Sequence, residues 1–463
     1  MEHIHFIGIG GTGLSAIARV LMESGYTVSG SDRSDTPLGR DLASAGIKVV
    51  VGHDARNVRG ADVVVRSSAV PDDNPEVIAA VAAGIPVLKR AAFLGRLMQG
   101  KLSIAVAGTH GKTTTTAMIS WVFTALGKDP SYIIGGVSKN LARNAHAGKG
   151  NIFILEADEY DRMFLGLEPD FAVINTLEHD HPDCFPTLQD YQQAFIDFVH
   201  CIKPGGHLFI CRDNAGAFRL AGAAQATRKV WTFGLEPSAD YHARSLEVND
   251  AGGFSFKLVF KPWGNSAEVA VPVSLQVPGE HNVRNALAAL AVCHQAGLDL
   301  EQASAVLAQF SGVGRRFDVL GTAGGVTVID DYAHHPTEIQ ATLAAARSRY
   351  GNRRIVVVWQ PHTYSRTIAL LDAFSSAFQA ASEVYVTEIY AARESNPQIT
   401  GEQLAEKINH PEVQFLPSLV KAHDLLLQKL RPGDVLLVLS AGDADQISRN
   451  VISGLQKLEV NHE

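Results

Sequence analysis

The sequence predicts an α/β protein with three domains, and two patterns along the chain support this prediction. At both ends, short apolar strands alternate with segments of helical periodicity, which indicates parallel sheets covered by helices. In the middle, strands with alternating apolar and polar residues indicate added antiparallel pairing. The 463 residues suit about three domains of ordinary size. We expect Rossmann-like domains over 1–99 and 314–463, and a central P-loop ATPase-type domain with an antiparallel β portion over 100–313.

The composition is that of a soluble globular protein, with 46% hydrophobic and 19% charged residues. A net charge of −8 argues against a nucleic-acid partner, because phosphate backbones attract basic surfaces. The four cysteines form no CxxC pair, which fits a reducing compartment and neither a disulfide framework nor a zinc site. No apolar run approaches the ~20 residues of a membrane helix, and no signal core precedes the first strand. We therefore expect a cytoplasmic protein without membrane insertion.

The first segment alternates between strands and helices from its start. Residues 4–7 are apolar and strand-like, and residues 14–24 have helical periodicity that ends at Gly25. This βαβ rhythm predicts a parallel sheet. Four further strands are expected at 27–30, 48–51, 62–66 and 86–88.

The turn between the first strand and helix reads Gly8-Ile9-Gly10-Gly11-Thr12-Gly13 and fits the pattern G-x-G-x-x-G. Such a turn holds a phosphate or diphosphate at a helix N-terminus. Asp32 follows the next strand, where a ribose-binding acid sits in a Rossmann unit, and Ser67 and Ser68 offer hydroxyls after a later strand. Taken alone, the turn allows an NAD(P)-dependent oxidoreductase, a UDP-sugar site, or glycines that serve packing only. Asp32 could equally be a cap or turn residue.

The second segment opens with a phosphate loop, Gly108-Thr109-His110-Gly111-Lys112-Thr113-Thr114, after an apolar strand at 103–107. Glycines let backbone N–H groups close around a phosphate, Lys112 adds a positive charge, and Thr113 offers a hydroxyl to Mg²⁺. Val106 stands where the first glycine of a Walker A sequence would be. A helix is expected from Lys112 to Leu126.

Acidic residues and histidines follow the two next apolar strands, expected at 152–155 and 171–175. They lie at the edge of the sheet that carries the phosphate loop, because parallel strands end together. Glu156 is the best carboxylate for a nucleotide-bound Mg²⁺, a hard cation that prefers oxygen. His181 with Asp180 could hold a second Mg²⁺ or orient its waters. Weaker candidates are Asp158, Glu159 and Asp161, and His179 is expected to be structural.

The remaining elements follow from the same patterns. Antiparallel strands packed beside the main sheet are expected at 230–233, 244–248, 253–260 and 267–271, followed by a helix from 279 to 294. The third segment repeats the βαβ rhythm. Its strands are expected at 325–330, 354–358, 383–387 and 434–439, and its helices at 336–350, 368–381, 401–408 and 419–430.

Polar chemistry also follows the strands of the third segment. Arg316 could offer its guanidinium to a phosphate, and Arg366 could clamp a carboxylate. The adjacent His334 and His335 allow a transition-metal site, but no cysteine or third histidine has matching spacing.

Together these motifs resemble those of the Mur ligases of peptidoglycan synthesis, in the family's order and over essentially the whole chain. The resemblance rests on the stretches 8–13 with 30–32, 108–114, 156–161, 279–285, 314–317, 330–338 and 360–367. It implies three domains that bind a UDP-sugar, ATP and an amino acid. It also implies an ATP-dependent ligase that joins L-alanine to the carboxylate of UDP-N-acetylmuramate through an acyl phosphate, with two Mg²⁺ ions. The expected partners are these small molecules in a bacterial cytoplasm, and a homodimer is allowed.

The resemblance assigns roles to the matching positions. The catalytic residues it implies are Lys112, Glu156, His181, Arg316 and His334, and the metal ligands are Thr113, Glu156 and His181. Its ATP site comprises Gly108, Thr109, His110, Gly111, Lys112, Thr113 and Thr114, with His281, Asn282 and Asn285 near adenine, Arg316 at the γ-phosphate and Asp331 at the ribose. Its UDP-sugar site comprises Gly8, Gly10, Gly11, Thr12, Gly13, Asp32, Ser67 and Ser68. Its amino-acid site comprises Tyr332, His334 and Arg366.

Two departures keep alternatives open. The stretch 178–186 looks more like the murein tripeptide-recycling ligase, whereas the glycine-rich turn, Tyr332 and the stretch 360–366 follow the alanine-adding pattern. Thr363 stands where many alanine ligases carry a second arginine. Outside the ligases, an NAD(P)-dependent oxidoreductase is opposed by the Lys112 loop, and a non-catalytic nucleotide-binding regulator is opposed by Glu156, His181 and Arg316.

Overall fold

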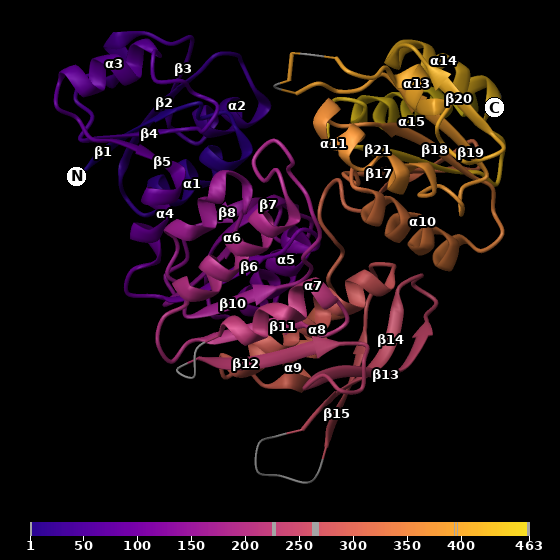
Figure 1. Cartoon of the computed structure of the whole chain (residues 1–463), viewed down its shortest axis with the longest axis horizontal. Helices are drawn as coiled ribbons and strands as arrows, with labels where there is room; N and C mark the ends of the chain where they lie inside the picture. The colour runs from indigo at the N-terminus through magenta and orange to yellow at the C-terminus, as the bar shows by residue number, and fades with distance from the viewer. Residues whose placement is uncertain (1, 225–227, 262–267, 393, 396, 461–463) are drawn as a thin grey trace.

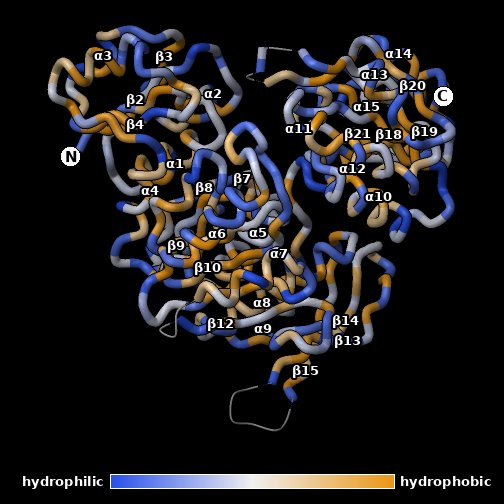
Figure 2. The backbone as a smooth tube through the Cα atoms, in the orientation of Figure 1, coloured by the Kyte–Doolittle hydropathy of each residue, from blue (hydrophilic) through white to orange (hydrophobic). Residues whose placement is uncertain are grey.

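The computed structural model describes residues 2–224, 228–261, 268–392, 394–395 and 397–460. They form three sheets that succeed one another along the chain (Figure 1). In this view the central body, coloured from purple through magenta to red-orange, lies below the indigo N-terminal body and the orange-to-yellow C-terminal body. In Figure 2 the hydrophobic segments concentrate on the buried strands. The three-domain α/β prediction is confirmed.

The N-terminal sheet is parallel throughout, with the order β3-β2-β1-β4-β5. Its strands are β1 (His3–Ile7), β2 (Thr27–Asp32), β3 (Lys48–Val51), β4 (Val63–Arg66) and β5 (Val87–Lys89). The chain order reverses at β1, and ligands of such sheets bind where the order reverses. The glycine-rich turn lies at this point, between β1 and α1 (Thr12–Glu23). The other helices are α2 (Pro37–Ser44), α3 (Pro75–Ala82) and α4 (Arg90–Met98).

The central sheet has ten strands in the order β15-β14-β13-β12-β11-β10-β6-β9-β7-β8. Its parallel core comprises β7 (Ser131–Ser138), β9 (Ile152–Glu156), β6 (Leu102–Ala107), β10 (Phe171–Ile174), β11 (His207–Cys211) and β12 (Lys229–Gly234). The other strands are β8 (Arg143–His146), β13 (Tyr241–Val248), β14 (Phe254–Phe260) and β15 (Val269–Ser274).

Two expectations for the middle of the chain are wrong. β12 pairs in parallel with β11, so it is not part of the antiparallel portion. The antiparallel strands β13, β14 and β15 extend the main sheet instead of packing beside it. Alternating hydrophobicity reports one buried face but not the direction or identity of the neighbouring strand. Residue 267, expected to begin the last strand, lies outside the described residues.

Helices α5 (Lys112–Ala125) and α8 (Glu280–Gln295) pack on each other and on the central sheet. Both begin at a glycine with positive φ, Gly111 (82°) and Gly279 (93°). Their N-termini meet, because a Cβ at Gly111 would lie 2.6 Å from Oδ1 of Asn285. The other central helices are α6 (Leu188–Cys201), α7 (Ala215–Phe218) and α9 (Leu300–Leu307).

The C-terminal sheet has the order β16-β17-β21-β18-β19-β20, with only the β16–β17 pair antiparallel. Its strands are β16 (Asp318–Ala323), β17 (Val326–Asp331), β18 (Ile355–Gln360), β19 (Glu383–Thr387), β20 (Val413–Leu416) and β21 (Val435–Ser440). Its helices are α10 (Pro336–Tyr350), α11 (Tyr364–Ala369), α12 (Leu371–Ser375), α13 (Gly401–Ala405), α14 (Leu419–Lys429) and α15 (Asp445–Val460). Figure 1 places α10 on the side that faces the central body.

The expected helix at 368–381 is wrong. The structure has two short helices, α11 and α12, which meet at Leu370 with φ −114°. Three elements of the C-terminal body went unpredicted: the edge strands β16 and β20 and the amphipathic helix α15. Edge strands are weak signals because they are short and half-exposed. Among the described residues, no helix combines the length and the apolar composition needed to cross a membrane.

Candidate active site

The phosphate loop leaves β6 at Gly108 and enters α5 at Lys112. Gly108 has φ 129°, and a Cβ there would lie 3.0 Å from the backbone nitrogen of Thr176. The segment after β10 fixes the loop, because the backbone N–H of Thr109 donates to the Thr176 carbonyl (2.9 Å) and that of His110 to the Thr176 hydroxyl (2.9 Å). Gly108 is therefore required for close backbone approach as well as for conformation.

Lys112 lies inside the loop with its ammonium group fully engaged. Nζ donates to the carbonyls of Gly108 (2.6 Å) and Thr109 (3.2 Å) and pairs with the completely buried Glu159 at 2.8 Å. Burial opposes the charged form, but the carboxylates of Glu159 and Glu156 raise the pKa of Lys112 above its ordinary value. Glu159, a weaker metal candidate in the sequence, is thus the counter-ion of the lysine.

Thr113 and Glu156 provide the oxygen donors expected for Mg²⁺. The Thr113 hydroxyl donates to Oε1 of Glu156 at 3.1 Å, and the backbone N–H of Gly135 donates to Oε2 at 2.8 Å. Burial raises the pKa of Glu156, although Lys112 and Thr113 act in the opposite direction. A buried carboxylate beside a hydroxyl fits a small hard cation, since both ligands are oxygen.

His181 lies among carboxylates in a backbone conformation with φ 55°. Its Nε2 is 3.6 Å from Oε1 of Glu159 and 3.7 Å from Oδ2 of Asp180. Burial lowers the pKa of His181, but Asp180 and Glu159 outweigh it and raise the pKa overall. The same two carboxylates would favour a metal cation at this nitrogen.

Arg366 reaches from α11 to the central body. Its Nε donates to Oδ1 of Asp180 at 2.7 Å, and both side chains are 4% exposed. Its other nitrogens lie 3.0 Å from Nδ1 of His362 and 3.4 Å from Nδ1 of His181. The arginine expected to bind the amino acid therefore contacts the histidine expected to bind metal.

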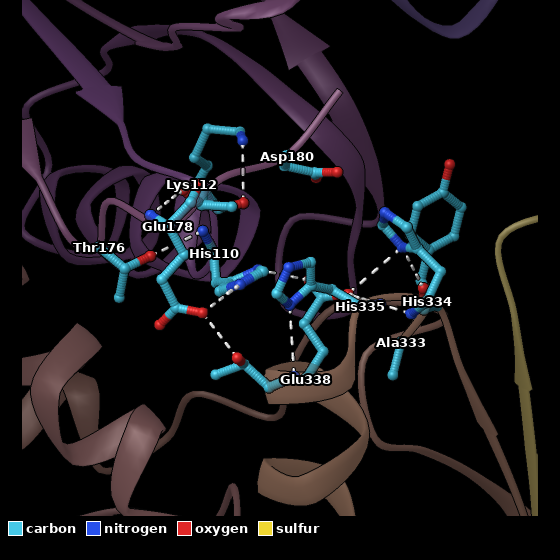
Figure 3. Close-up of polar contacts among 12 residues, drawn as sticks. His110, Lys112, Thr176, Glu178, Asp180, Ala333, His334, His335 and Glu338 are labelled. Atoms are coloured by element: carbon cyan, nitrogen blue, oxygen red, sulfur yellow. Dashed lines mark hydrogen bonds and ion pairs between the residues drawn. The ribbon is translucent and has the colours of Figure 1, made fainter. Parts of the chain in front are cut away.

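His110, Glu178, His335 and Glu338 converge where the phosphate loop meets the start of α10 (Figure 3). The structure brings His110 and Glu178 within 4.8 Å of His335, ligand atom to ligand atom, which the spacing in the sequence did not indicate. His335 uses its Nδ1 in the helix cap, where it accepts from the backbone N–H of Thr337 at 3.3 Å, while its Nε2 is buried without a hydrogen-bond partner among the described residues. Despite burial, Glu338 and Glu178 raise the pKa of His110 to about 9. A protonated His110 between carboxylates explains this cluster without a metal ion.

A cavity of about 340 Å³ opens on one side of the loop. It brings together most of the residues expected to bind ATP: His110, Gly111, Thr113, Thr114, His281, Asn282, Asn285, Arg316 and Asp331. Burial lowers the pKa of His281 to about 4, so this imidazole is neutral at pH 7. Asp331 accepts from the backbone N–H groups of Phe317 and Ala333, both at 2.7 Å, and burial raises its pKa to about 6.

A second cavity of about 690 Å³ is lined by all three bodies. The N-terminal body contributes Thr12, Gly13 and Arg90. The other two contribute Lys112, Glu156, His181, Arg316, Tyr332, His334 and Arg366. His334 is neutral there, because burial lowers its pKa to about 3.

Arg90 was not identified from the sequence. Its Nη2 donates to Oδ2 of Asp158 at 2.8 Å, which links the N-terminal and central bodies. A Cβ at Gly13 would lie 1.9 Å from Nη1 of Arg90. The last glycine of the turn thus makes room for an arginine, a purpose that a motif cannot reveal.

The other residues expected to bind the UDP-sugar lie outside the described lining of both cavities: Gly8, Gly10, Gly11, Asp32, Ser67 and Ser68. Asp32 stabilises the glycine-rich turn, since its Oδ2 accepts from the backbone N–H of Gly10 at 2.9 Å. The hydroxyl of Ser68 donates to Asp161 of the central body at 2.9 Å. Their role toward a UDP-sugar stays a prediction.

The chain matches three family domains in succession. These are "Mur ligase family, catalytic domain" over residues 3–102, "Mur ligase middle domain" over 106–293 and "Mur ligase, glutamate ligase domain" over 315–442. The chain belongs to the Mur ligase family. These matches favour a ligase over the oxidoreductase that the glycine-rich turn alone allowed.

Individual relatives agree with this family. This Mur ligase is 44% identical to a UDP-N-acetylmuramate–L-alanine ligase of Nitratidesulfovibrio vulgaris (strain DP4), over 97% of this chain and 98% of that protein. It also resembles the crystal structure of the UDP-N-acetylmuramate–alanine ligase of Thermotoga maritima, with TM-score 0.81, 30% identity and coverage of 99% and 100%. The structure of a murein peptide ligase from Psychrobacter arcticus is also similar, with TM-score 0.71, 27% identity and coverage of 98% and 99%.

Proposed function

We propose that this Mur ligase joins L-alanine to the carboxylate of UDP-N-acetylmuramate at the expense of ATP. The observation that carries the proposal is the 690 Å³ cavity, where the glycine-rich turn, the phosphate loop and Arg366 face one space. A γ-phosphate, a sugar-linked carboxylate and an amino acid can meet only where three such sites share a cavity. The names of the relatives supply the identity of the substrates.

Each substrate has its own region in this proposal. ATP occupies the 340 Å³ cavity, with adenine near His281, Asn282 and Asn285 and the ribose near Asp331. Its phosphates follow the loop to Lys112 and Arg316. The diphosphate of the UDP-sugar lies at the N-terminus of α1, beside Thr12 and Gly13. Alanine lies near Tyr332, His334 and Arg366.

In the first step, the substrate carboxylate attacks the γ-phosphorus of ATP. An oxygen–phosphorus bond forms and the bond between the γ-phosphorus and the β-phosphate oxygen breaks. ADP departs, and the substrate becomes an acyl phosphate. Negative charge spreads over the transferred oxygens, and the side chains of Lys112 and Arg316 neutralise it. The Glu159 carboxylate fixes the Lys112 ammonium group in place beforehand, at 2.8 Å.

The residues present fit Mg²⁺, since Thr113 and Glu156 offer oxygen ligands and His181 offers a nitrogen. When bound, Mg²⁺ neutralises phosphate charge. Mur ligases depend on ATP. For this chain, the binding of two Mg²⁺ ions and the role of His181 as a ligand are our proposal.

In the second step, the amine of alanine attacks the acyl carbon. A tetrahedral intermediate forms, the carbon–oxygen bond to phosphate breaks, and an amide and inorganic phosphate result, with one proton released from nitrogen. Nδ1–H of His334 donates to the Tyr332 carbonyl at 2.9 Å, which leaves Nε2 as an acceptor. Burial lowers the pKa of His334 to about 3. Its Nε2 is therefore better suited to accept a hydrogen bond from the amine of alanine than to take up the proton that this amine releases.

The test is phosphate release from ATP with Mg²⁺ and UDP-N-acetylmuramate, with either L-alanine or the murein tripeptide added. Release that requires alanine, with an amide product found by mass spectrometry, supports the proposal. Release only with tripeptide would overturn it in favour of the peptide-recycling reaction. The stretch 178–186 and the similarity to a murein peptide ligase make that reaction the second candidate.

A bacterial cytoplasmic location and a homodimer remain predictions. Light scattering tests the homodimer.

A further inference from the structure

Glu338 occupies the third position of α10, three residues after the N-cap His335. A glutamate at this position normally returns to the helix start and accepts from the N-cap backbone N–H. Glu338 does so, since its Oε2 lies 3.3 Å from the backbone nitrogen of His335 and 3.1 Å from that of His334. Its other oxygen has different partners.

Oε1 of Glu338 faces the central body and the predicted ATP site. It lies 3.2 Å from Nδ1 of His110 in the phosphate loop and 3.5 Å from Nη1 of Arg316. The Glu338 side chain is 13% exposed, and despite burial the cations around it hold its pKa well below the usual range. The carboxylate is therefore charged, and one oxygen holds two groups that we assign to ATP. Figure 3 shows one of them, His110, beside Glu338.

Oε2 of Glu338 faces the predicted alanine site. Nδ1 of His334 lies 3.3 Å from it, and the same imidazole donates to the Tyr332 carbonyl. The orientation of His334 thus depends on the carboxylate that also orients His110 and Arg316. The three groups come from two bodies of the protein.

We propose that Glu338 is a positioning residue that couples the phosphate-loop site to the alanine site; this inference rests on the proposed function. When the two bodies meet, its charge holds His110, Arg316 and His334 in one arrangement, so ATP and alanine each bind better in the presence of the other. Such coupling is reciprocal. A carboxylate held in a poorly hydrated site acts more strongly than it would in water.

The helix cap alone does not require this charge. In α13 of the same chain, Gln403 occupies the equivalent position and completes the cap with Thr400. Glu338→Gln therefore keeps an acceptor for the cap and removes the charge. It is the variant that separates positioning from helix stability.

We expect Glu338→Gln to keep its melting temperature within a few degrees, to raise the KM for L-alanine by about fivefold or more, and to weaken the dependence of that KM on ATP concentration. The charged or titratable groups facing His110 are Glu338, Glu178 and His335. Loss of the Glu338 charge lowers the pKa of His110, so the alkaline fall of kcat/KM for ATP should move to lower pH. A structural role alone would not shift this profile.

Glu178→Gln is the matched control. Glu178 faces His110 through the pair at 3.7 Å and accepts from the Thr337 hydroxyl, and among the described residues it forms no hydrogen bond or ion pair with His334 or Arg316. It should shift the pH profile and leave the KM for alanine unchanged. If Glu338→Gln unfolds, His110→Asn tests the coupling from the other side, since a loop substitution should then raise the KM for alanine. Unchanged alanine KM and pH profile in a folded variant would overturn the coupling. Failure of the wild-type protein to ligate alanine would instead refute the proposed function.

Discussion

Arg366 and Asp180 form a buried ion pair that joins the C-terminal and central bodies, with 2.7 Å between Nε and Oδ1. Despite burial, His181 and Arg366 hold the pKa of Asp180 well below its usual range. The pair fixes a guanidinium group that would otherwise sample many orientations beside the proposed alanine site. Under the proposed function, binding of the amino acid by Arg366 then depends on a residue of another body.

The first prediction concerns this pair. Asp180→Asn removes the charge that holds Arg366, so kcat/KM for L-alanine should fall by about 10- to 100-fold, with a smaller change in the KM for ATP. Steady-state phosphate release measures both constants. Asp183→Asn is the control, because Asp183 is an exposed carboxylate in the same loop that accepts from the Tyr160 hydroxyl at 3.1 Å, and it should cause a much smaller loss. Equal losses in the two variants would contradict the assignment.

The second prediction concerns Lys112. Lys112→Ala should reduce turnover by about 100- to 1,000-fold or more, because transferred phosphate charge is no longer neutralised. It should also destabilise the protein by about 3 to 5 kcal/mol, because Glu159 is left buried without its cation. Denaturant unfolding and calorimetric titration with UDP-N-acetylmuramate check these statements. The UDP-sugar should still bind, since the glycine-rich turn belongs to another body, and normal turnover would refute the phosphate-loop assignment.

The third prediction concerns Gly13. In Gly13→Ala the new Cβ would displace the Arg90 guanidinium, which lies 1.9 Å from that position. A flexible side chain can move, so we expect a folded protein whose KM for the UDP-sugar rises by about tenfold as Arg90 leaves Asp158. Gly222→Ala is the control, because a Cβ there meets no atom within 4 Å. An unchanged KM in Gly13→Ala would show that Arg90 has no part in substrate binding.

The fourth prediction concerns pH and Glu76 in α3. Its buried carboxylate accepts from Ser31 at 2.6 Å and Asn57 at 2.6 Å and lies 3.2 Å from Nε2 of His5. Burial raises its pKa, but these partners lower it overall from 4.5 to about 2. A lowered folded-state pKa gives stability that is present above pH 4.5 and lost as pH falls toward 2.

This shift corresponds to about 3 kcal/mol of unfolding free energy at neutral pH. Glu76→Gln should lose most of it and should show a flatter decline of stability between pH 5 and pH 2. Urea unfolding at several pH values measures the difference. Identical pH profiles for the two proteins would mean that the Glu76 network contributes nothing to stability.

Much of the fold was predictable because its signals are local. The expected strands at 48–51 and 383–387 and the helix at 336–350 coincide with β3, β19 and α10. Hydrophobic periodicity and a proline at the helix start determine such elements without help from the rest of the chain. The direction of β12 and the break at Leu370 depend on neighbours that are distant in the sequence, so they were not predictable from it.

The candidate site divides in the same way. The sequence by itself determined which residues form the phosphate loop, such as Gly111 and Lys112, because phosphate binding demands fixed spacing within one loop. Only the tertiary structure decided that Glu159 pairs with Lys112, that Arg90 passes over Gly13, and that Glu338 faces His110, 228 residues away. The physical reason is that a motif encodes contacts within one turn of chain, whereas charge pairing in a buried cavity depends on how separate bodies pack.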